Sequence, residues 1–298
     1  MHLIARRSLA QQVAAYVALT KPRIIELLLV TTLPTMVVAQ QGLPSVGLMV
    51  ATLVGGTLAA AGANAINMYV DRDIDALMER TKNRPLVTGE MSPAAALTFA
   101  IGLEVVAFVV LWALVNLLSA VLAVSACLFY VFVYTLWLKR TSKQNIVIGG
   151  AAGAVPVLVG WAAVTNSLAW APVLMFAIIF VWTPPHFWAL AIRYRDDYAA
   201  ADVPMLPAVE SLRYTAIRIL AYTILLWALT LVLAPVADLG GIYVASAVVL
   251  GALFTAMAVR LLRNPTPPVA MRLFTFSITY LTVLWVAMAV DVLVVHGI

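Results

Sequence analysis

Long apolar segments alternate with short polar connections along almost the whole chain. Each segment has roughly the 20 residues that an α-helix needs to cross a lipid bilayer at about 1.5 Å per residue. The pattern therefore predicts an all-α polytopic membrane protein with nine transmembrane helices. We expect the spans at residues 24–42, 46–68, 94–115, 118–138, 146–164, 169–192, 214–234, 241–262 and 270–295.

The composition supports this class of protein. Hydrophobic residues make up 64% of the chain and charged residues only 10%, against roughly a quarter charged in ordinary globular domains. The lone Cys127 lies within the fourth expected span, which excludes an internal disulfide. We expect residues 1–298 to form a single transmembrane domain, with residues 1–23 as a short interfacial segment on the cytoplasmic side. The alternative for this acid-free, arginine-bearing start is a rudimentary mitochondrial presequence.

Basic residues mark the orientation in the membrane. With nine spans, all 18 Lys and Arg residues fall on one side, whereas opposite connections such as residues 40–45 and 235–240 carry none. The positive-inside rule makes the basic side cytoplasmic, with the amino terminus inside and the carboxyl terminus outside. The net charge of +5 therefore reflects orientation and not binding to nucleic acid.

The second span ends in a row of oxygen-bearing side chains. Asn67, Asp71 and Asp75 occur at i, i+4 and i+8, so in a helix they share one face while Asp73 points elsewhere. Clustered oxygens repel one another unless a cation joins them, and Mg²⁺ prefers such ligands together with substrate phosphates. The spacing predicts a magnesium and diphosphate site. The alternative is a solvated, charged loop between membrane helices.

A second acidic loop follows the sixth span, as the first follows the second span. It contains Arg193 and Asp197, and the offset of four helices is a weak internal repeat whose two loops can converge on one mouth. The fourth span ends with Tyr134, followed by Lys139 and Arg140. This arrangement fits an anion-binding site, and it also fits the aromatic belt and basic loop of any cytoplasmic interface.

Two ionisable residues lie within the expected spans. His186 follows Pro184 and Pro185, which remove backbone donors and are expected to break the sixth helix about 10 Å below its cytoplasmic end. A histidine at such a place is a functional candidate, and the alternative is a hydrogen-bonded structural histidine. Glu104 lies near the middle of the third span, and the sequence identifies no partner for it.

The acidic row resembles a known motif. Asn67, Asp71 and Asp75 match Asn-x-x-x-Asp-x-x-x-Asp, the first motif of the UbiA superfamily of intramembrane prenyltransferases. More narrowly, residues 67–85, 139–156 and 183–188 resemble the protoheme IX farnesyltransferases, or heme O synthases. The resemblance implies a nine-helix bundle whose active cavity opens to the cytoplasm, Mg²⁺-dependent use of farnesyl diphosphate, and heme b as the acceptor.

The same resemblance implies a cellular setting. It places the chain in the bacterial cytoplasmic (inner) membrane, with the mitochondrial inner membrane as the alternative. Heme A synthase or cytochrome oxidase assembly factors are the protein partners that it suggests.

The resemblance also implies roles for individual residues. Two departures from the superfamily argue against a fully symmetric two-metal site. The second motif, often Asp-x-x-x-Asp, is here Arg193 and Asp197, and a Tyr-x-x-x-Lys element is not kept because Tyr134 is five residues before Lys139. The implied catalytic and metal-binding residues are Asn67, Asp71, Asp75 and Asp197, and the implied substrate-binding residues are Lys139, Arg140, Arg193, Tyr134 and His186.

Two other functions fit part of the pattern. An aromatic prenyltransferase of quinone synthesis would use the same chemistry on a phenolic acceptor, usually with two intact aspartate motifs. A cation-coupled transporter would use Glu104, His186 and the acidic loops as an ion path. The transporter interpretation does not explain why the acids cluster with Lys and Arg on one side only.

Overall fold

Helices form the regular secondary structure of the chain in this computed structural model. It describes residues 8–295 and 297, without the side chains of residues 23–28, and the described part contains no strand. Residues 1–7 of the expected interfacial segment lie outside the described residues. The helices are α1 (Leu9–Thr20), α2 (Pro22–Gln40), α3 (Val46–Val70), α4 (Arg72–Asp75), α5 (Pro93–Leu114), α6 (Leu117–Leu128), η1 (Phe129–Leu138), α7 (Lys139–Thr141), α8 (Asn145–Thr165), α9 (Trp170–Arg193), α10 (Arg195–Ala200), α11 (Leu206–Val209), α12 (Leu212–Val236), α13 (Gly241–Arg263) and α14 (Pro267–Val295).

The expected spans all coincide with helices. Eight helices of the described chain are long and apolar enough to cross a membrane, with α6, η1 and α7 counted as one. The expected first span corresponds to α2, whose described apolar part is Leu29–Gln40. The chain is therefore a polytopic membrane protein, as predicted.

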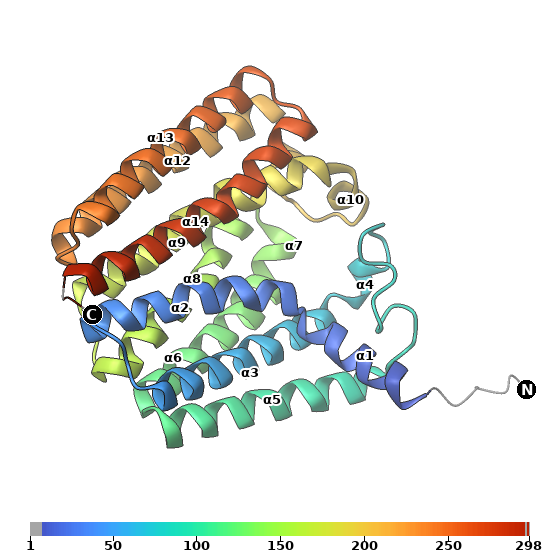
Figure 1. The fold of residues 1–298 in the computed structure, drawn as a ribbon. Coiled ribbons are helices and arrows are strands. Elements are labelled where there is room, and N and C mark those ends of the chain that lie inside the picture. The colour runs from blue at the N-terminus through green and yellow to red at the C-terminus, as the bar shows by residue number, and fades with distance from the viewer. Residues whose placement is uncertain (1–7, 296, 298) are drawn as a thin grey trace, which may run out of the picture.

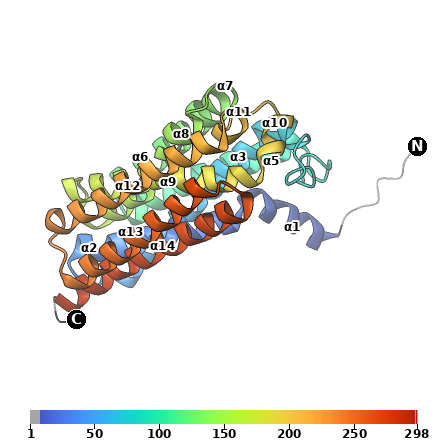
Figure 2. The ribbon, with the colours of Figure 1, turned by 90° about the horizontal axis from the view of Figure 1, so that it is seen from above.

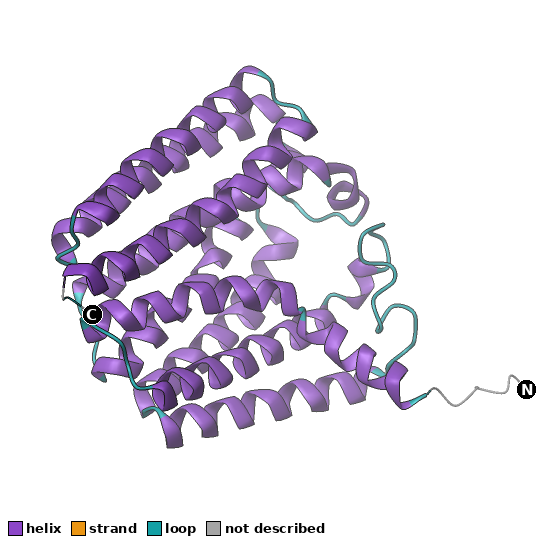
Figure 3. Cartoon of the chain, in the orientation of Figure 1, coloured by secondary structure: helices purple, strands orange, loops and turns teal. Residues whose placement is uncertain are grey.

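The long helices run side by side and place the polar segments together. Figures 1 and 2 show α1, α4, α7, α10 and the longer connections at one end of the bundle, with the carboxyl terminus at the other. Figure 3 shows that the loops lie at the two ends of the helices. The end that carries the short helices is called the polar end below.

Small residues on α3 let it approach α5 closely. A Cβ added at Gly55 would lie 2.5 Å from the Leu111 side chain, and one added at Gly62 would lie 2.7 Å from the Glu104 carboxylate. Neither distance is compatible with ordinary van der Waals contact, so each glycine is needed for the approach. The tight pair fixes the end of α3, where the acidic row begins.

The first helix turns sharply into the second. Ser8 caps α1 by accepting a hydrogen bond from the Gln11 amide, and Leu19 is buried in a cluster with Ala65 of α3. Lys21 then adopts a left-handed conformation, with φ of 51°, before Pro22 begins α2. This turn brings Lys21 beside the end of α3.

The two prolines of α9 do not break it, which corrects the expected interruption. Pro184 and Pro185 lie inside a helix that continues to Arg193. Proline's fixed φ is compatible with helical geometry, so what is lost is the backbone donor and not the helical path. Thr183 donates through Oγ1 to the Ile179 carbonyl, 2.8 Å away, just before the prolines.

The ten residues of η1 form a π-helix, in which residues five apart are joined by hydrogen bonds. The Lys139 amide bonds to the Tyr134 carbonyl in this way, and Thr135 Oγ1 donates to the Tyr130 carbonyl at 2.8 Å. The five-residue separation of Tyr134 and Lys139 is thus one π turn. The extra residue is absorbed within η1, so the departure from Tyr-x-x-x-Lys does not remove Lys139 from the site.

A carboxylate from α14 caps the start of α13. Asp291 is 1% exposed and accepts hydrogen bonds from the amides of Gly240, Ile242 and Tyr243. These amides have no helical partner of their own, because they lie at a helix amino terminus. Asp291 therefore ties the last helix to α13 at the end opposite the acidic row.

Candidate functional site

Asp71 lies at the centre of the polar end of the bundle. Its side chain is fully buried at the end of α3, where it forms an ion pair with Lys139. Asn67 Nδ2 donates to Asp71 Oδ2 at 2.8 Å and to Thr135 Oγ1 at 3.1 Å. The expected one-face arrangement of Asn67 and Asp71 is confirmed, and η1 supplies the opposite wall.

Asp75 forms a second buried pair one turn further along. Arg84 donates to Asp75 Oδ2 at 2.5 Å, and Asp75 is only 1% exposed. Thr81 Oγ1 donates to the Asp75 carbonyl at 2.9 Å, which closes the loop that carries Arg84 back onto α4. Asp75, the last residue of the acidic row, thus holds the segment that follows the row in its folded position.

Asp73 points away from this face, as expected from its spacing. Its side chain is 60% exposed and accepts two hydrogen bonds of 2.7 Å from Arg140. The hydrogen bond from Arg140 lowers the pKa of Asp73 to about 2. Arg140 Nη2 also lies 3.8 Å from Asp71 Oδ1, so one guanidinium spans both faces.

Lys21 completes the cluster, and the sequence interpretation missed it. Its Nζ donates to Asn67 Oδ1 at 2.8 Å, whereas a lysine before the first span is ordinarily a membrane anchor. Burial, followed by the nearby charges of Arg84 and Lys139, lowers the pKa of Lys21 to about 7. No spacing rule in the sequence connects Lys21 with Asn67, because the left-handed turn before α2 makes the contact.

The two acidic loops meet at the polar end. The Arg80 amide donates to Asp197 Oδ2 at 3.4 Å, and the Arg80 guanidinium lies 5.2 Å from the centre of the Tyr198 ring. Burial raises the pKa of Tyr198. Lys143 pairs with Glu210 at 2.7 Å and joins the loop after η1 to the second acidic loop. The four-helix offset in the sequence does bring the loops together.

Arg193 lies apart from this cluster. It is exposed in the last turn of α9 and makes no ion pair with the aspartates in the described part of the chain. Tyr134 is partly buried, stacks on Tyr130 with ring centres 5.3 Å apart, and fills the space that the absent side chain of Gly149 leaves open. Of the two, Tyr134 is the better placed for a role near Asp71.

His186 is buried between α9 and α14. Its Nδ1 lies 2.7 Å from Ser277 Oγ, which is itself 2.6 Å from the Phe274 carbonyl oxygen. Trp182 stacks on the imidazole with ring centres 4.2 Å apart, and Trp182 Nε1 donates to the Ser277 carbonyl at 2.9 Å. Trp182 and His186 therefore both form hydrogen bonds with the same residue of α14, Ser277. The sequence shows no signal for Ser277, because it lies 91 residues from His186.

The side-chain oxygens of Asn67, Asp71 and Asp75 are suitable magnesium ligands, but most of them are already paired with basic side chains. Asp71 Oδ1 is buried and accepts no hydrogen bond from the described residues, with Arg140 Nη2 3.8 Å away, so this oxygen can still coordinate a cation. Asp71 Oδ2, Asp75 Oδ2 and Asn67 Oδ1 each accept from a lysine or arginine donor. In this arrangement the described chain has no cluster of three or more acidic, His or Cys side chains around a metal position. A metal with a diphosphate would replace these internal pairs, since the basic partners can turn to the phosphate oxygens.

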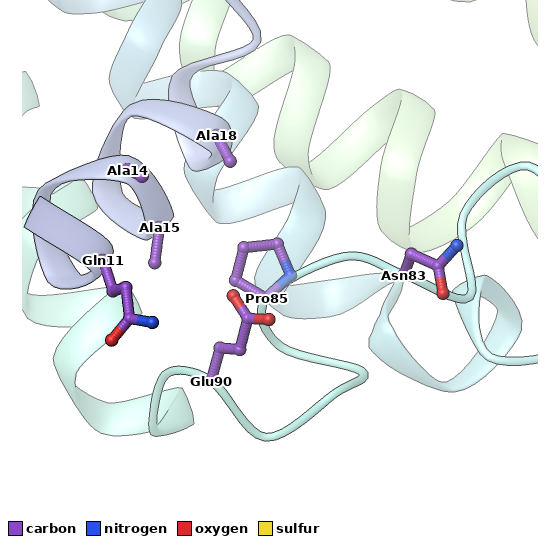
Figure 4. A pocket seen from close by; sticks show the side chains of 7 residues that line it. All are labelled: Gln11, Ala14, Ala15, Ala18, Asn83, Pro85 and Glu90. Carbon is purple, nitrogen blue, oxygen red and sulfur yellow. The ribbon is translucent and has the colours of Figure 1, made fainter. Parts of the chain in front are cut away.

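A pocket of about 290 Å³ lies beside the cluster but is separate from it. Figure 4 shows it between α1 and the loop at residues 83–90, with Gln11 on the α1 side and Pro85 and Glu90 on the loop side. Its lining includes none of the aspartates or their cations. The chemistry lies in the aspartate cluster, so that cluster is the candidate active site.

Comparisons with known sequences agree on one family. The model of the UbiA prenyltransferase family matches residues 28–286. The chain is 57% identical to the protoheme IX farnesyltransferase of Parafrankia sp., over 92% of this chain and 89% of that protein. It is 50% identical to the protoheme IX farnesyltransferase of Streptomyces coelicolor, over 96% of this chain and 93% of that protein.

Solved structures share the fold. A structure of digeranylgeranylglyceryl phosphate synthase matches with a TM-score of 0.78 and 16% identity, covering 94% of this chain and 98% of the other. A UbiA homologue from Archaeoglobus fulgidus bound to GPP and Mg²⁺ matches with a TM-score of 0.65 and 16% identity, covering 92% of this chain and 99% of the other. At this level of identity the likeness concerns the helical bundle alone.

Proposed function

The chain belongs to the UbiA prenyltransferase family, and from this membership we propose that it transfers the farnesyl group of farnesyl diphosphate to a vinyl group of heme b. The products would be heme O and diphosphate. Relatives at 50–57% identity are named protoheme IX farnesyltransferase, which makes the chain a prenyltransferase and the transporter interpretation wrong.

One structural observation supports the proposal most directly. Lys21, Arg84, Lys139 and Arg140 gather around three aspartates at the polar end of the bundle, and two of those aspartates are buried. Arg84, Lys139 and Arg140 pair with the three carboxylates, whereas Lys21 contacts only the neutral Asn67 side chain, so a further negative charge beside it would favour its protonated form. A diphosphate bound with a divalent cation supplies such a charge, and a solvated loop would have no reason to bury these pairs.

The same side chains suit the first chemical step. Cleavage of the farnesyl carbon–oxygen bond leaves the electron pair on diphosphate, and preformed cations stabilise that developing charge. Lys139 and Arg84 would turn from their aspartates to the phosphate oxygens. Bound Mg²⁺, held by Asn67, Asp71, Asp75 and Asp197, would supply further charge neutralisation.

Aromatic side chains suit the second step. The allylic cation needs dry surroundings and π-faces, which contribute about 1 to 2 kcal/mol per well-placed ring when desolvated. Tyr134, Trp182 and Trp188 are candidates, and Trp182 and Trp188 are almost fully buried. The vinyl π-electrons form the new carbon–carbon bond, and water then adds to the resulting cation and loses a proton, which gives a hydroxyethylfarnesyl group.

We assign His186 to the heme. It lies in α9, on the helix that leads to the second acidic loop, so a diphosphate held by Asp71 and Asp75 would direct its isoprenoid tail toward this part of the bundle. A neutral imidazole there would ligate the heme iron or hold the water of the last step. The polar end would face the cytoplasm of a bacterium, in accord with the positive-inside rule.

The test is the reaction itself. Purified protein is incubated with labelled farnesyl diphosphate, Mg²⁺ and either heme b or 4-hydroxybenzoate, and the products are identified by mass spectrometry. Labelled heme O, lost when Mg²⁺ is chelated, is the expected result. Label in 4-hydroxybenzoate alone would assign the chain to aromatic prenylation instead.

A further inference from the structure

Ser277 of α14 is the side chain that decides which nitrogen of His186 carries the proton. A serine hydroxyl has one hydrogen, and a backbone carbonyl can only accept. Ser277 Oγ lies 2.6 Å from the Phe274 carbonyl oxygen, so that hydrogen is donated there. The 2.7 Å contact between Ser277 Oγ and His186 Nδ1 therefore requires Nδ1 to be the donor.

This assignment leaves His186 Nε2 with its lone pair. No described residue donates a hydrogen bond to Nε2, and Nε2 is not among the polar atoms that are sealed without a partner. A ring with Nδ1 protonated and Nε2 open has a lone pair that can bind a metal, and the partner of Nδ1 fixes the ring's tautomer and orientation. The ring is also held by Trp182 and by Phe274, whose ring centre lies 4.6 Å away.

We infer that Ser277 is a positioning residue for the acceptor, because it holds His186 in the tautomer whose Nε2 binds the iron of heme b. The inference rests on the proposed function and extends it to a residue outside every motif. Ser277 does not touch the diphosphate cluster, since its contacts are to Phe274, Trp182 and His186. Its loss should therefore affect the acceptor and not the donor.

The contacts between α9 and α14 explain why replacing Ser277 alone would change the tautomer of His186. Trp182 and His186 are four residues apart on α9, so they share one face, and that face meets both the carbonyl and the hydroxyl of Ser277. Replacing the hydroxyl by hydrogen leaves the Trp182 bond intact. The packing of α9 on α14 is then kept, and only the fixed tautomer is lost.

The experiment compares Ser277→Ala, Ser277→Thr and the parent, with Ser246→Ala as the matched control. Ser246 is a partly buried serine of α13 whose hydroxyl donates to the Ile242 carbonyl of its own helix. Heme b is titrated by visible absorbance in the purified full-length protein, and steady-state constants are measured for both substrates. Thermal stability of each variant shows whether it is folded.

For Ser277→Ala we expect heme affinity to fall about 10- to 100-fold, as for other partners of metal-binding histidines, with loss of the histidine-ligated absorbance spectrum. Its KM for farnesyl diphosphate should stay within about twofold of the parent value. Ser277→Thr, which keeps a hydroxyl, and Ser246→Ala should match the parent in heme affinity and spectrum.

Two results would overturn the inference. Ser277→Ala with the parent's heme spectrum and affinity would show that the tautomer is irrelevant, and equal losses in Ser277→Ala and Ser277→Thr would show that space and not the hydroxyl matters. Failure of the parent protein itself to bind heme b would overturn the proposed function as well, and this outcome is distinct from the other two.

Discussion

Replacing Asp71 by asparagine tests the acidic row with almost no change in size. Asp71 is fully buried and paired with Lys139, so the substitution leaves a buried lysine without a counter-charge, at a cost of about 3 to 5 kcal/mol. It also removes a negative ligand of the metal and diphosphate assembly. We expect turnover to fall by at least about 10²- to 10³-fold, the loss seen when one preorganised charge-stabilising group is removed.

Asp73→Asn is the matched comparison. Asp73 is largely exposed and its pair with Arg140 is worth about 0 to 1 kcal/mol, so both stability and turnover should change little. Turnover of labelled farnesyl diphosphate and thermal unfolding are measured for each variant. Equal loss of activity at Asp71 and Asp73 would refute the one-face arrangement.

A double variant separates stability from chemistry. Asp71→Asn with Lys139→Met leaves no unpaired buried charge, so the thermal stability should return toward that of the parent. Turnover should stay low, because neither the ligand nor the phosphate-binding lysine is restored. Recovery of turnover in the double variant would mean that Asp71 serves only to neutralise Lys139.

Three further outcomes follow from the structure. Lys21→Met should raise the KM for farnesyl diphosphate by about tenfold in steady-state assays, because it removes one charge-assisted donor at Asn67, and an unchanged KM would make Lys21 a membrane anchor only. In a cysteine-free background, cysteines introduced at Gln41 and Lys143 should be labelled in intact cells only at Gln41, and labelling at Lys143 would refute the orientation. Asp291→Asn should lower the unfolding free energy by about 1 to 3 kcal/mol in thermal or denaturant unfolding, because it weakens the cap of α13. Turnover of the folded protein should not change, since this cap lies at the end of the bundle opposite the acidic row. A stability equal to the parent's would show that the cap is not important.

The positions of the helices could be predicted from the sequence because hydropathy and bilayer thickness restrict them strongly. The expected span at residues 46–68 is α3 at Val46–Val70, and the expected span at residues 241–262 is α13 at Gly241–Arg263. The prediction of a broken α9 was wrong, since Pro184 and Pro185 remove donors without forcing the chain out of its helical path. The π-helix η1 was not predicted, because nothing in its apolar sequence distinguishes hydrogen bonds to the fifth residue from those to the fourth.

The site was predictable where its residues lie close in sequence or follow the four-helix repeat that brings Arg80 and Asp197 together. The i, i+4 relation of Asn67 and Asp71 is visible in the sequence, and the structure confirms it with a 2.8 Å hydrogen bond. Lys21 and Ser277 were not predictable, because each reaches its partner across the bundle through a turn or a helix pair that only the fold brings together.

The central claim is that the chain holds the diphosphate and the acceptor in two separate sets of side chains. Its most direct test measures both bindings in parallel for Asp71→Asn and His186→Ala, with farnesyl diphosphate and Mg²⁺ followed by calorimetry and heme b by absorbance titration. We expect His186→Ala to weaken heme binding with farnesyl diphosphate binding nearly intact, and Asp71→Asn to do the reverse. If His186→Ala binds heme b and turns over like the parent, His186 is a structural residue of the α9 and α14 interface, and the assignment of the acceptor site is contradicted.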